Sequence, residues 1–279
     1  MRVLVYIEEH LDEPMHLEHI AKIAHISPFH FHRIFRAIIG ETLHSYIQRL
    51  RLEYARGALH FSQKSITEIC LESGYENHSA FTKMFKLLMG ISPQAYRQRM
   101  QPYVENMLKQ TQTIKPQWID QVQYVDRKEE EVLFIRRTGD YQNTPLEAFR
   151  ALLTFLDKED KWDQVKALYG MGLDDSLIVE KRKLRFDACV SLKNSIIASG
   201  EVGKKKLPAC RCAAFIFKGP YHQIEEAILD IFRYWYTDCN KELSPLQPIC
   251  ECLDLLDHRL DRSEGNTKIY IPIMHYSPR

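Results

Sequence analysis

The stretch SPFHFHRIFRAIIG at residues 27–40 returns fifty residues later as NHSAFTKMFKLLMG at residues 77–90, and this repetition decides the fold of the first hundred residues. In each copy the apolar side chains recur at i, i+3, i+4 and i+7, which is typical of a helix that buries one face and leaves the other free. Upstream, residues 20–26 are matched by residues 69–75 and predict a shorter helix and a tight turn. A helix, a turn and a second helix, present twice, are the usual framework of a DNA reader.

Residues at the expected helix ends support this prediction. Ser27 is expected to cap the first copy, with Pro28 at the first helical position, where a missing N–H removes no hydrogen bond. Asn77 or Ser79 can cap the second copy. Between the copies, Thr42 to His60 is predicted to form one long helix that holds the two units at a fixed separation.

Residues from about 15 to 100 resemble the AraC/XylS DNA-binding domain. The resemblance is carried by residues 27–40, by YIQRLRLEYARGAL at residues 46–59 and by GYENHSAFTKMFKLLMGISPQAYR at residues 74–97. It implies that the partner is double-stranded DNA. It also implies two recognition helices in successive major grooves, about 34 Å apart, so that one chain spans about 20 base pairs.

The resemblance assigns roles residue by residue. Arg33 can make two hydrogen bonds to guanine, and Phe29 can cover a thymine methyl group. The full set of expected base-facing side chains is Phe29, His32, Arg33, His78, Ser79, Thr82 and Lys83. Contacts to phosphates, which set affinity rather than sequence preference, are expected at Lys22, Arg49, Arg51, Lys86 and Arg97. The alternative for each residue is a solvated side chain on an outer helix face.

The charge and histidine content of residues 1–105 bear on how strongly they are expected to bind DNA and on whether they bind a metal. Residues 1–105 contain 12 Lys and Arg against 11 Asp and Glu, and the remainder contains 26 of each, so the totals show no basic footprint. We therefore expect only modest non-specific DNA binding. Nine of the twelve histidines fall in residues 1–105, but none has metal-ligand spacing: His30 and His32, for example, point apart on a helix. No metal or other cofactor is predicted.

Length and composition predict a globular protein of two domains, because 279 residues with 45% hydrophobic content can form two cores. The N-terminus has no apolar stretch long enough for a secretory signal, and no run of 18 apolar residues occurs. We therefore expect a cytoplasmic protein with no membrane partner. Seven cysteines are then expected to be reduced.

Two pairs of cysteines have C-x-C spacing. Cys210 with Cys212, and Cys250 with Cys252, could bind zinc or sense redox state. On a strand, however, residues i and i+2 share a face, so small thiols filling one side of a sheet give the same pattern. Core packing is the favoured interpretation for both pairs.

The chain changes character around residues 101–117, QPYVENMLKQTQTIKPQ, where two prolines enclose a polar run. We assign residues 1–105 to the DNA-binding domain, 106–117 to a linker and 118–279 to a second domain. Strands are predicted there at Gln123 to Val125, Val132 to Arg137, Leu184 to Leu192, Arg211 to Lys218, Ile249 to Leu255 and Ile269 to Met274, with helices at about Pro145 to Lys158 and His222 to Lys241. This mixture predicts an α+β domain with an antiparallel sheet after an all-α domain with two helix-turn-helix units joined by a long helix.

The second domain also repeats itself, at a spacing of 80. Gly139 and Tyr141 correspond to Gly219 and Tyr221, and an amphipathic helix follows each pair. This predicts an internal pseudo-twofold repeat. Two facing units leave a cleft at their seam, and ligand sites favour interfaces of this kind.

Asp120 to Met274 resembles the GyrI-like effector-binding domain. The motifs are YGMGLDD (169–175), RFDACVSL (185–192), KGPY (218–221) and IYIPI (269–273). The resemblance implies binding of amphipathic or cationic small molecules in a central cleft. With the helix-turn-helix part first, the arrangement is similar to that of Rob-like bacterial activators.

The position matched to the family's ligand-binding glutamate is Glu251. It is the only charge between Pro248 and Leu253, and its side chain should point opposite to those of Cys250 and Cys252. An aromatic wall beside it would suit a positively charged, apolar ligand, although ordinary core packing is the alternative for each ring. The aromatic candidates are Trp162, Tyr169, Trp235 and Tyr270.

Two positions of this sequence depart from the family pattern, and the charge of the ligand therefore stays open. The family favours an aromatic residue before the glutamate and a glutamate before the Ile-Tyr-Ile-Pro strand, and here these positions hold Cys250 and Lys268. We expect a transcriptional activator that senses a small molecule and contacts RNA polymerase. One alternative is a regulator whose second domain is a protein-interaction module without ligand. Another is a GyrI-like hydrolase of a reactive small molecule, but no nucleophile and base are evident, so no enzyme is predicted.

Overall fold

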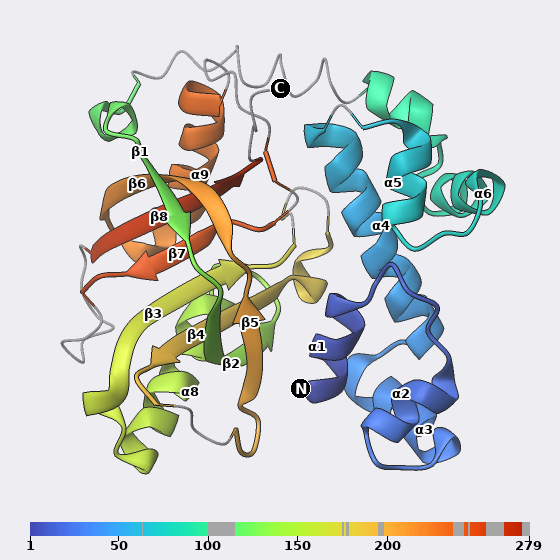
Figure 1. Cartoon of the computed structure of the whole chain (residues 1–279), viewed down its shortest axis with the longest axis horizontal. Coiled ribbons are helices and arrows are strands. Elements are labelled where there is room, and N and C mark those ends of the chain that lie inside the picture. Colours follow the sequence, from blue (N-terminus) through green and yellow to red (C-terminus); the bar gives the residue numbers. More distant parts are fainter. Residues whose placement is uncertain are drawn as a thin grey trace. The chain divides into compact units, whose positions relative to one another are not determined.

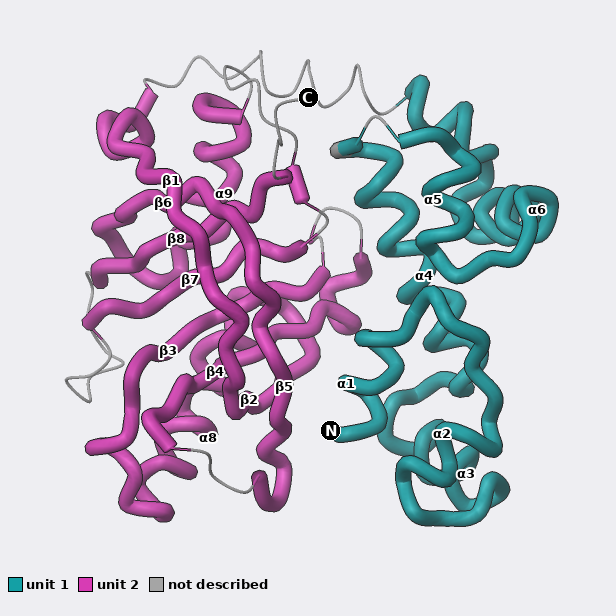
Figure 2. The backbone as a smooth tube through the Cα atoms, viewed as in Figure 1, with its two compact units in different colours: residues 1–107 teal, residues 108–279 magenta. Residues whose placement is uncertain are grey.

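The computed structural model describes residues 1–62, 64–99, 115–174, 176, 179–194, 198–236, 243–244, 246–254 and 265–274. The chain forms two compact units, Met1–Met107 and Leu108–Arg279 (Figure 2). Each unit is described separately below. Residues 106–114 of the predicted linker lie outside the described residues.

The first unit is all-helical, as predicted (Figure 1). Its helices are α1 (Arg2–Glu9), α2 (Leu17–Ile23), α3 (Pro28–Ile39), α4 (Leu43–Phe61), α5 (Ile66–Glu72) and α6 (His78–Met89), and residues 93–99 are also helical. The 19-residue helix α4 lies in the chain between the two helix-turn-helix units. Its first half contributes to one apolar core and its second half to another.

Side chains cap the helices that follow each turn. The Ser27 hydroxyl accepts from the backbone N–H of His30 at 3.4 Å and caps α3. The Asn77 side chain accepts from the N–H of Ala80 at 2.8 Å, so Asn77 rather than Ser79 caps α6. Each cap satisfies one of the backbone donors that a helix start leaves unpaired.

The two cores are built alike, around a triad of aromatic rings. In the first helix-turn-helix copy Phe31 and Phe35 lie 5.4 Å apart between ring centroids, and Tyr46 meets Phe35 edge-on at 5.5 Å. In the second helix-turn-helix copy the equivalent distances are 5.7 and 5.5 Å. The rings of that triad are Phe81, Phe85 and Tyr96. The repeat in the sequence is therefore a repeat in side-chain packing, which orients α3 and α6 in the same way within their units.

The turn before each of these helices requires a left-handed backbone. Gly74 has φ +73° in the second helix-turn-helix copy, and His25 has φ +58° at the equivalent position in the first copy. In L-residues with a Cβ this conformation is strained, whereas glycine adopts it freely. A Cβ on Gly74 would also overlap the Leu11 carbonyl oxygen and approach Arg51 Cζ to 2.8 Å.

We expect His25→Gly to stabilise the protein by about 0.5–1 kcal/mol, because it removes strain from an exposed turn. The matched change Gly74→Ala should destabilise it by about 2–4 kcal/mol, through strain and overlap together. Urea denaturation of the full chain, followed by helical circular dichroism, measures both. A loss of stability in His25→Gly would show that the histidine ring contributes more than its backbone costs.

The second unit contains an eight-stranded antiparallel sheet. Its strands are β1 (Gln123–Arg127), β2 (Glu130–Thr138), β3 (Val165–Gly172), β4 (Arg185–Leu192), β5 (Gly203–Leu207), β6 (Cys210–Gly219), β7 (Ile249–Cys252) and β8 (Gly265–Ile273). Their order across the sheet is β1-β6-β8-β7-β3-β4-β2-β5. The predicted α+β class with an antiparallel sheet is confirmed.

Two strands were absent from the sequence prediction. β3, VKALYGMG, contains two glycines, which weaken a strand signal. β5, GKKKL, has three consecutive lysines and lies at the edge of the sheet, where lysines protect a strand against pairing with other chains. Leu255, at the end of the predicted strand that became β7, lies outside the described residues.

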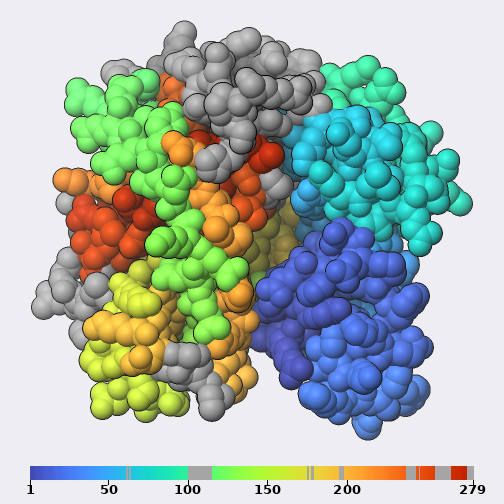
Figure 3. Space-filling view, in the orientation of Figure 1, coloured from blue at the N-terminus to red at the C-terminus, as the bar shows by residue number. Residues whose placement is uncertain are grey.

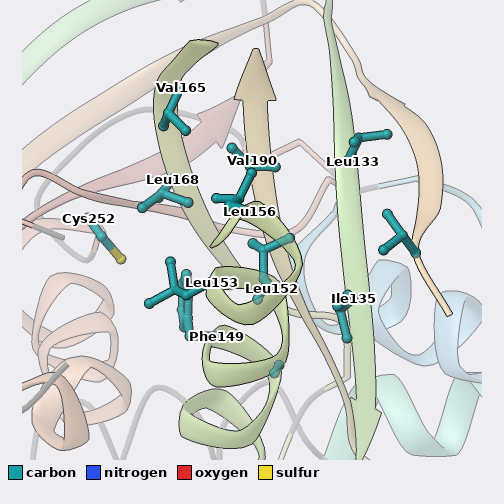
Figure 4. Close-up of a cluster of buried hydrophobic side chains, with 13 residues drawn as sticks. Leu133, Ile135, Phe149, Leu152, Leu153, Leu156, Val165, Leu168, Val190 and Cys252 are labelled. Carbon is teal, nitrogen blue, oxygen red and sulfur yellow. The ribbon is translucent and has the colours of Figure 1, made fainter. Parts of the chain in front are cut away.

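Helices cover one face of the sheet. α8 (Thr144–Glu159) packs on β2 and β4, and its apolar side chains meet theirs in one core (Figure 4). α9 (Ile224–Asp230) continues as a π-helix, Ile231–Tyr236, and contacts β6. Short 3-10 turns lie at Gln117–Asp120, Trp162–Gln164, Lys181–Lys183 and Tyr221–Gln223.

The sheet is curled because two short connections join its opposite margins. Residues 128–129 link β1 to β2, and residues 208–209 link β5 to β6, although each pair of strands lies near opposite ends of the strand order. Three peptide steps reach at most about 11 Å, so the margins must approach one another. Figure 1 shows β1 and β5 running in front of the rest of the sheet.

Contacts across the curl identify its inner face. β1 and β3 are four strand spacings apart, about 19 Å along a flat sheet. Nevertheless, Arg127 Cζ on β1 lies 4.9 Å from the ring centroid of Tyr169 on β3. The face that carries these two side chains is therefore concave, and the face covered by α8 is convex.

Candidate DNA-reading helices and ligand-binding face

On α3 the predicted reading residues Phe29 and Arg33 are exposed, whereas Phe31 and Phe35 are buried. Phe29 is 73% exposed, and Arg33 is exposed with its Cζ 5.8 Å from the Phe29 ring centroid. His32 is half-buried. A large apolar ring left in water beside a guanidinium is the kind of surface that base edges can cover.

α6 presents the equivalent face. His78, Ser79 and Lys83 are exposed, and Thr82 is half-buried with its hydroxyl 3.3 Å from Nδ1 of His78. Thr82 is the repeat partner of His32, and Lys83 that of Arg33. The two helices thus expose the same positions but different chemistry, as two different half-sites would require.

One further basic residue is a candidate for the predicted phosphate contacts. Arg36 on α3 is exposed and occupies the repeat position of Lys86 on α6, which is also exposed. The sequence repeat, with its spacing of fifty residues, would have identified Arg36 as the counterpart of Lys86. Lys22, another predicted phosphate contact, is exposed on α2.

The prediction of a phosphate contact is wrong for Arg51. Its side chain is buried, and its guanidinium donates from Nε to the Leu11 carbonyl at 2.8 Å and from Nη2 to the Glu13 carbonyl at 2.7 Å. Arg97 is committed in a similar way, because its Nη2 donates to the Lys64 carbonyl at 2.7 Å. Both arginines donate hydrogen bonds to backbone carbonyls in the loops next to helices. We therefore correct their roles from DNA contact to stabilisation of the fold.

Arg49 is also engaged within the protein. Its guanidinium pairs with Glu41 at 2.7 Å and with Glu53 at 3.0 Å. Two carboxylates already neutralise this cation, which weakens its attraction for a phosphate. The prediction for Arg49 therefore stands without support from its surroundings.

We expect Arg33→Ala to cost about 1–3 kcal/mol in binding to a preferred duplex and to relax preference at one base pair. Lys86→Ala should weaken binding to all sequences alike, because it removes only a phosphate contact. Selection from random duplex DNA followed by titration of the full chain measures both effects. Equal affinities of wild type and Arg33→Ala for the selected site would remove Arg33 from the reading set.

In the second unit, three of the five predicted ligand-binding residues meet on the concave face. Tyr169 on β3 pairs directly with Glu251 on β7. The Tyr270 hydroxyl, from β8, donates to Glu251 Oε2 at 2.5 Å, and the Tyr169 hydroxyl donates to Glu130 Oε2 at 2.8 Å. Burial, together with these hydrogen bonds to carboxylates, raises the pKa of both tyrosines, which therefore remain donors.

Arg127 occupies the space between the two rings. Its Cζ lies 4.9 Å from the Tyr169 ring centroid and 4.6 Å from that of Tyr270, and Nη2 lies 3.7 Å from Glu130 Oε2. The side chain is only 10% exposed, and Nη1 has no hydrogen-bond partner among the described residues. The sequence offered no signal for Arg127, because only the curl brings β1 across to β3.

The predicted positions of Trp162 and Trp235 in the ligand site are wrong. Trp235 is 7% exposed and packs edge-on against Phe215 at 5.3 Å on the helix-covered face. Trp162 packs against the core under α8 and donates from its indole N–H to Asp157 at 2.6 Å. Both tryptophans therefore pack on the convex face of the sheet. Glu251 points to the concave face, because side chains on successive residues of a strand point to opposite faces and its neighbours Cys250 and Cys252 point to the convex face.

A second charged cluster lies on the concave face. Asp187 is fully buried and accepts from Arg136 Nε and Nη2 at 2.7 and 2.8 Å and from Lys205 at 2.6 Å. Burial opposes ionisation of Asp187, but the charges of Arg136 and Lys205 outweigh it and lower its pKa to about 2. The three residues form a cluster with one excess positive charge.

A cavity borders Glu130 rather than Glu251. It has a volume of about 280 Å³ and lies at one end of β2, β3 and β4. Its lining includes Lys166, Lys193 and Asn194. Arg127 lies against the rings of both Tyr169 and Tyr270.

Cys250 and Cys252 are buried, and Cys252 belongs to the core under α8. In the residues that the structure describes, no three His, Cys, Asp or Glu side chains are grouped to hold a metal ion. Within the same residues, no helix is both long and apolar enough to cross a bilayer.

Comparison with known proteins agrees with this geometry. Residues 120–274, more than half of the chain, match the family described as the GyrI-like small molecule binding domain. The chain belongs to the GyrI-like family. Residues 20–99 match the family described as the helix-turn-helix domain.

Relatives place the first part of this GyrI-like protein among AraC-type regulators. The regulatory protein SoxS of Escherichia coli (strain K12) is 30% identical over 98 residues, which are 35% of this chain and 92% of SoxS. The MmsAB operon regulatory protein of Pseudomonas aeruginosa is 37% identical over 95 residues, 34% of this chain but only 31% of that relative. The solved DNA-binding domain of AdpA, in complex with a target DNA, is 29% identical, with a TM-score of 0.35 over 36% of this chain and 91% of that one. The predicted resemblance to both families is confirmed.

We expect Asp187→Asn to cost about 3–5 kcal/mol at pH 7, because it keeps the shape but leaves two buried cations without a counter-charge. Since folding lowers the pKa of Asp187 from 3.8 to about 2, its carboxylate stabilises the fold above about pH 4, and this stabilisation is lost as the pH falls from 4 to 2. Denaturation of both proteins at pH 7, 4 and 2.5 measures the difference. A difference that stays constant over this range would contradict the assignment.

Proposed function

We propose that the chain is a sequence-specific transcriptional activator whose GyrI-like domain binds a small-molecule effector. The observation that carries this proposal is the pairing, in one chain, of two equally built reading helices with a second unit whose concave face gathers carboxylates and tyrosine rings. Double-stranded DNA, the effector and RNA polymerase are the proposed partners. Such a protein acts in the cytoplasm and has no enzymatic activity of its own.

Transcription from a template that carries the selected duplex site tests the direction of regulation. Purified bacterial RNA polymerase should give more transcript when the full chain is added. Less transcript would make the chain a repressor, and no change would leave DNA binding without a link to polymerase.

The inner face supports an amphipathic organic cation as the effector. Two carboxylates, Glu130 and Glu251, lie beside two ring faces, which attract a cation through their π-electrons. Arg127 already fills this place with a cation from the chain itself. An external cation of similar width would bind by displacing Arg127, whereas Lys268, 5.4 Å from the Tyr270 ring centroid, opposes it.

We also propose that the second unit is an internal pseudo-twofold repeat. In support, the strand order β6-β8-β7 is followed by β3-β4-β2, so equivalent strands of the two copies lie at equal distances from the junction of β7 and β3. Tyr169 and Glu251 pair at this junction. The ligand face would then straddle the symmetry axis, where each copy contributes one acid and one ring.

Glu251→Gln should weaken binding of tetraphenylphosphonium by about 1–3 kcal/mol, since it keeps the shape but removes a charge-assisted contact. Neutral triphenylphosphine oxide should bind the variant and the wild type alike. Arg127→Gln should change affinity in the opposite direction and tighten binding of the cation, because the internal competitor is gone. Calorimetry on the full chain measures all of these affinities.

Trp235→Phe is the matched control, because Trp235 lies on the other face of the sheet. If Glu251→Gln binds both probes as wild type does, the glutamate is structural and the cation-sensor proposal fails. If neither the wild type nor any variant binds either probe, the result favours the alternative function, in which the second unit is a protein-interaction module.

A further inference from the structure

Cys210 and Cys212 lie on the same face of β6 with their sulfur atoms in contact. The distance between the two Sγ atoms is 3.4 Å. Cys210 is the first residue of the strand and is half-exposed, whereas Cys212 is buried. Cys210 is therefore the more accessible residue of the pair.

The surroundings of the pair favour a thiolate at Cys210. Arg127 on β1 is the direct cross-strand neighbour of Cys210. The hydrogen bond from Cys212 outweighs the effect of burial and, with the positive charge of Arg127, lowers the pKa of Cys210 to about 7. The same hydrogen bond raises the pKa of Cys212, so the proton of the pair stays on the inner sulfur.

The other cysteines that the structure describes in this unit lack these features. Cys250 and Cys252 have the same spacing on β7, but both are buried, and burial raises the pKa of Cys250 to about 12 and that of Cys252 still higher. Cys189 is likewise buried, with its pKa raised to about 12. The chain therefore contains its own control, a second C-x-C pair without exposure or a neighbouring cation.

We propose that Cys210 and Cys212 form an oxidation site at which hydroperoxides convert the two thiols into an intramolecular disulfide. The Cys210 thiolate attacks the outer oxygen of the hydroperoxide, the O–O bond breaks, and the departing alkoxide takes a proton to become an alcohol. Cys210 is thereby oxidised to a sulfenic acid. The Cys212 sulfur then attacks the Cys210 sulfur, forming the S–S bond and breaking the S–O bond, and the departing hydroxide takes the Cys212 proton to become water.

The position of the pair makes this disulfide reversible. Two residues along a strand advance the backbone by about 6.6–6.8 Å, which is the upper end of the Cα separations that disulfides bridge. Cys210 can move to close this distance, because the exposed residues 208–209 precede it. A strained and partly exposed disulfide is readily reduced. β1, which pairs with the start of β6, is the green strand on the surface in Figure 3.

The test uses the full chain with Cys239→Ser in every variant, because Cys239 lies outside the described residues. The protein is treated with hydrogen peroxide, the remaining thiols are alkylated, and the chain is digested with trypsin after unfolding. Cleavage after Arg211 separates LPACR (207–211) from CAAFIFK (212–218), so the disulfide appears as these two peptides joined. We expect this species, and we expect dithiothreitol to abolish it.

Four variants isolate the roles of the residues. Cys212→Ser should accumulate sulfenic acid at Cys210, trapped by dimedone, while Cys210→Ser should give no label at Cys212. Without oxidant, alkylation of Cys210 should be at least about tenfold faster than that of Cys250, given the difference in thiolate fraction. Arg127→Gln should slow oxidation of Cys210, whereas Arg137→Gln, which removes a cation paired with Glu201 and leaves the tryptic site at Arg211 intact, should not.

Absence of the joined peptides at peroxide doses that oxidise free glutathione would overturn the proposal. Equal oxidation of Cys250 and Cys252 would also overturn it, because general unfolding rather than a built site would then explain the reaction. These outcomes do not depend on DNA or effector binding.

Discussion

The second unit depends on one constraint, the pair of two-residue connections that tie opposite margins of the sheet together. The sheet must curl to satisfy them, and the curl encloses a face that in a flat sheet would meet water. Polar side chains on this face therefore lose their solvent and have to satisfy one another. The cluster around Asp187 does so with three hydrogen bonds from two cations.

The same enclosure explains why Arg127 matters. On a flat sheet it would be an ordinary solvated residue of an edge strand, but the curl places it against two tyrosine rings from β3 and β8. There its charge has two effects: it pairs with Glu130, and it favours the thiolate of Cys210. A ligand that moves Arg127 would alter both, which links the proposed effector face and the cysteine pair through one side chain.

The first unit is built differently. It contains two small apolar cores, and α4 contributes side chains to both. Equal aromatic triads orient α3 and α6 within their units, so the outward residues can vary without disturbing the frame. The outward faces differ in sequence, with Arg33 exposed in one copy where Lys83 is exposed in the other. The buried arginine Arg51 shows that a basic residue in such a frame can equally serve the fold.

The sequence alone determined the two helix-turn-helix units, their caps and the antiparallel sheet, because these depend on local periodicity and on residues close in the chain. It also predicted Glu251, Tyr169 and Tyr270 as ligand-binding residues, and the structure brings these three together on one face. Only the tertiary structure decided that Trp162 and Trp235 lie on the other face, that Arg51 is buried and that Arg127 reaches the tyrosines. The reason is physical: which strands become neighbours, and which way a sheet curls, follow from connections between distant segments, and no pattern of nearby residues records them.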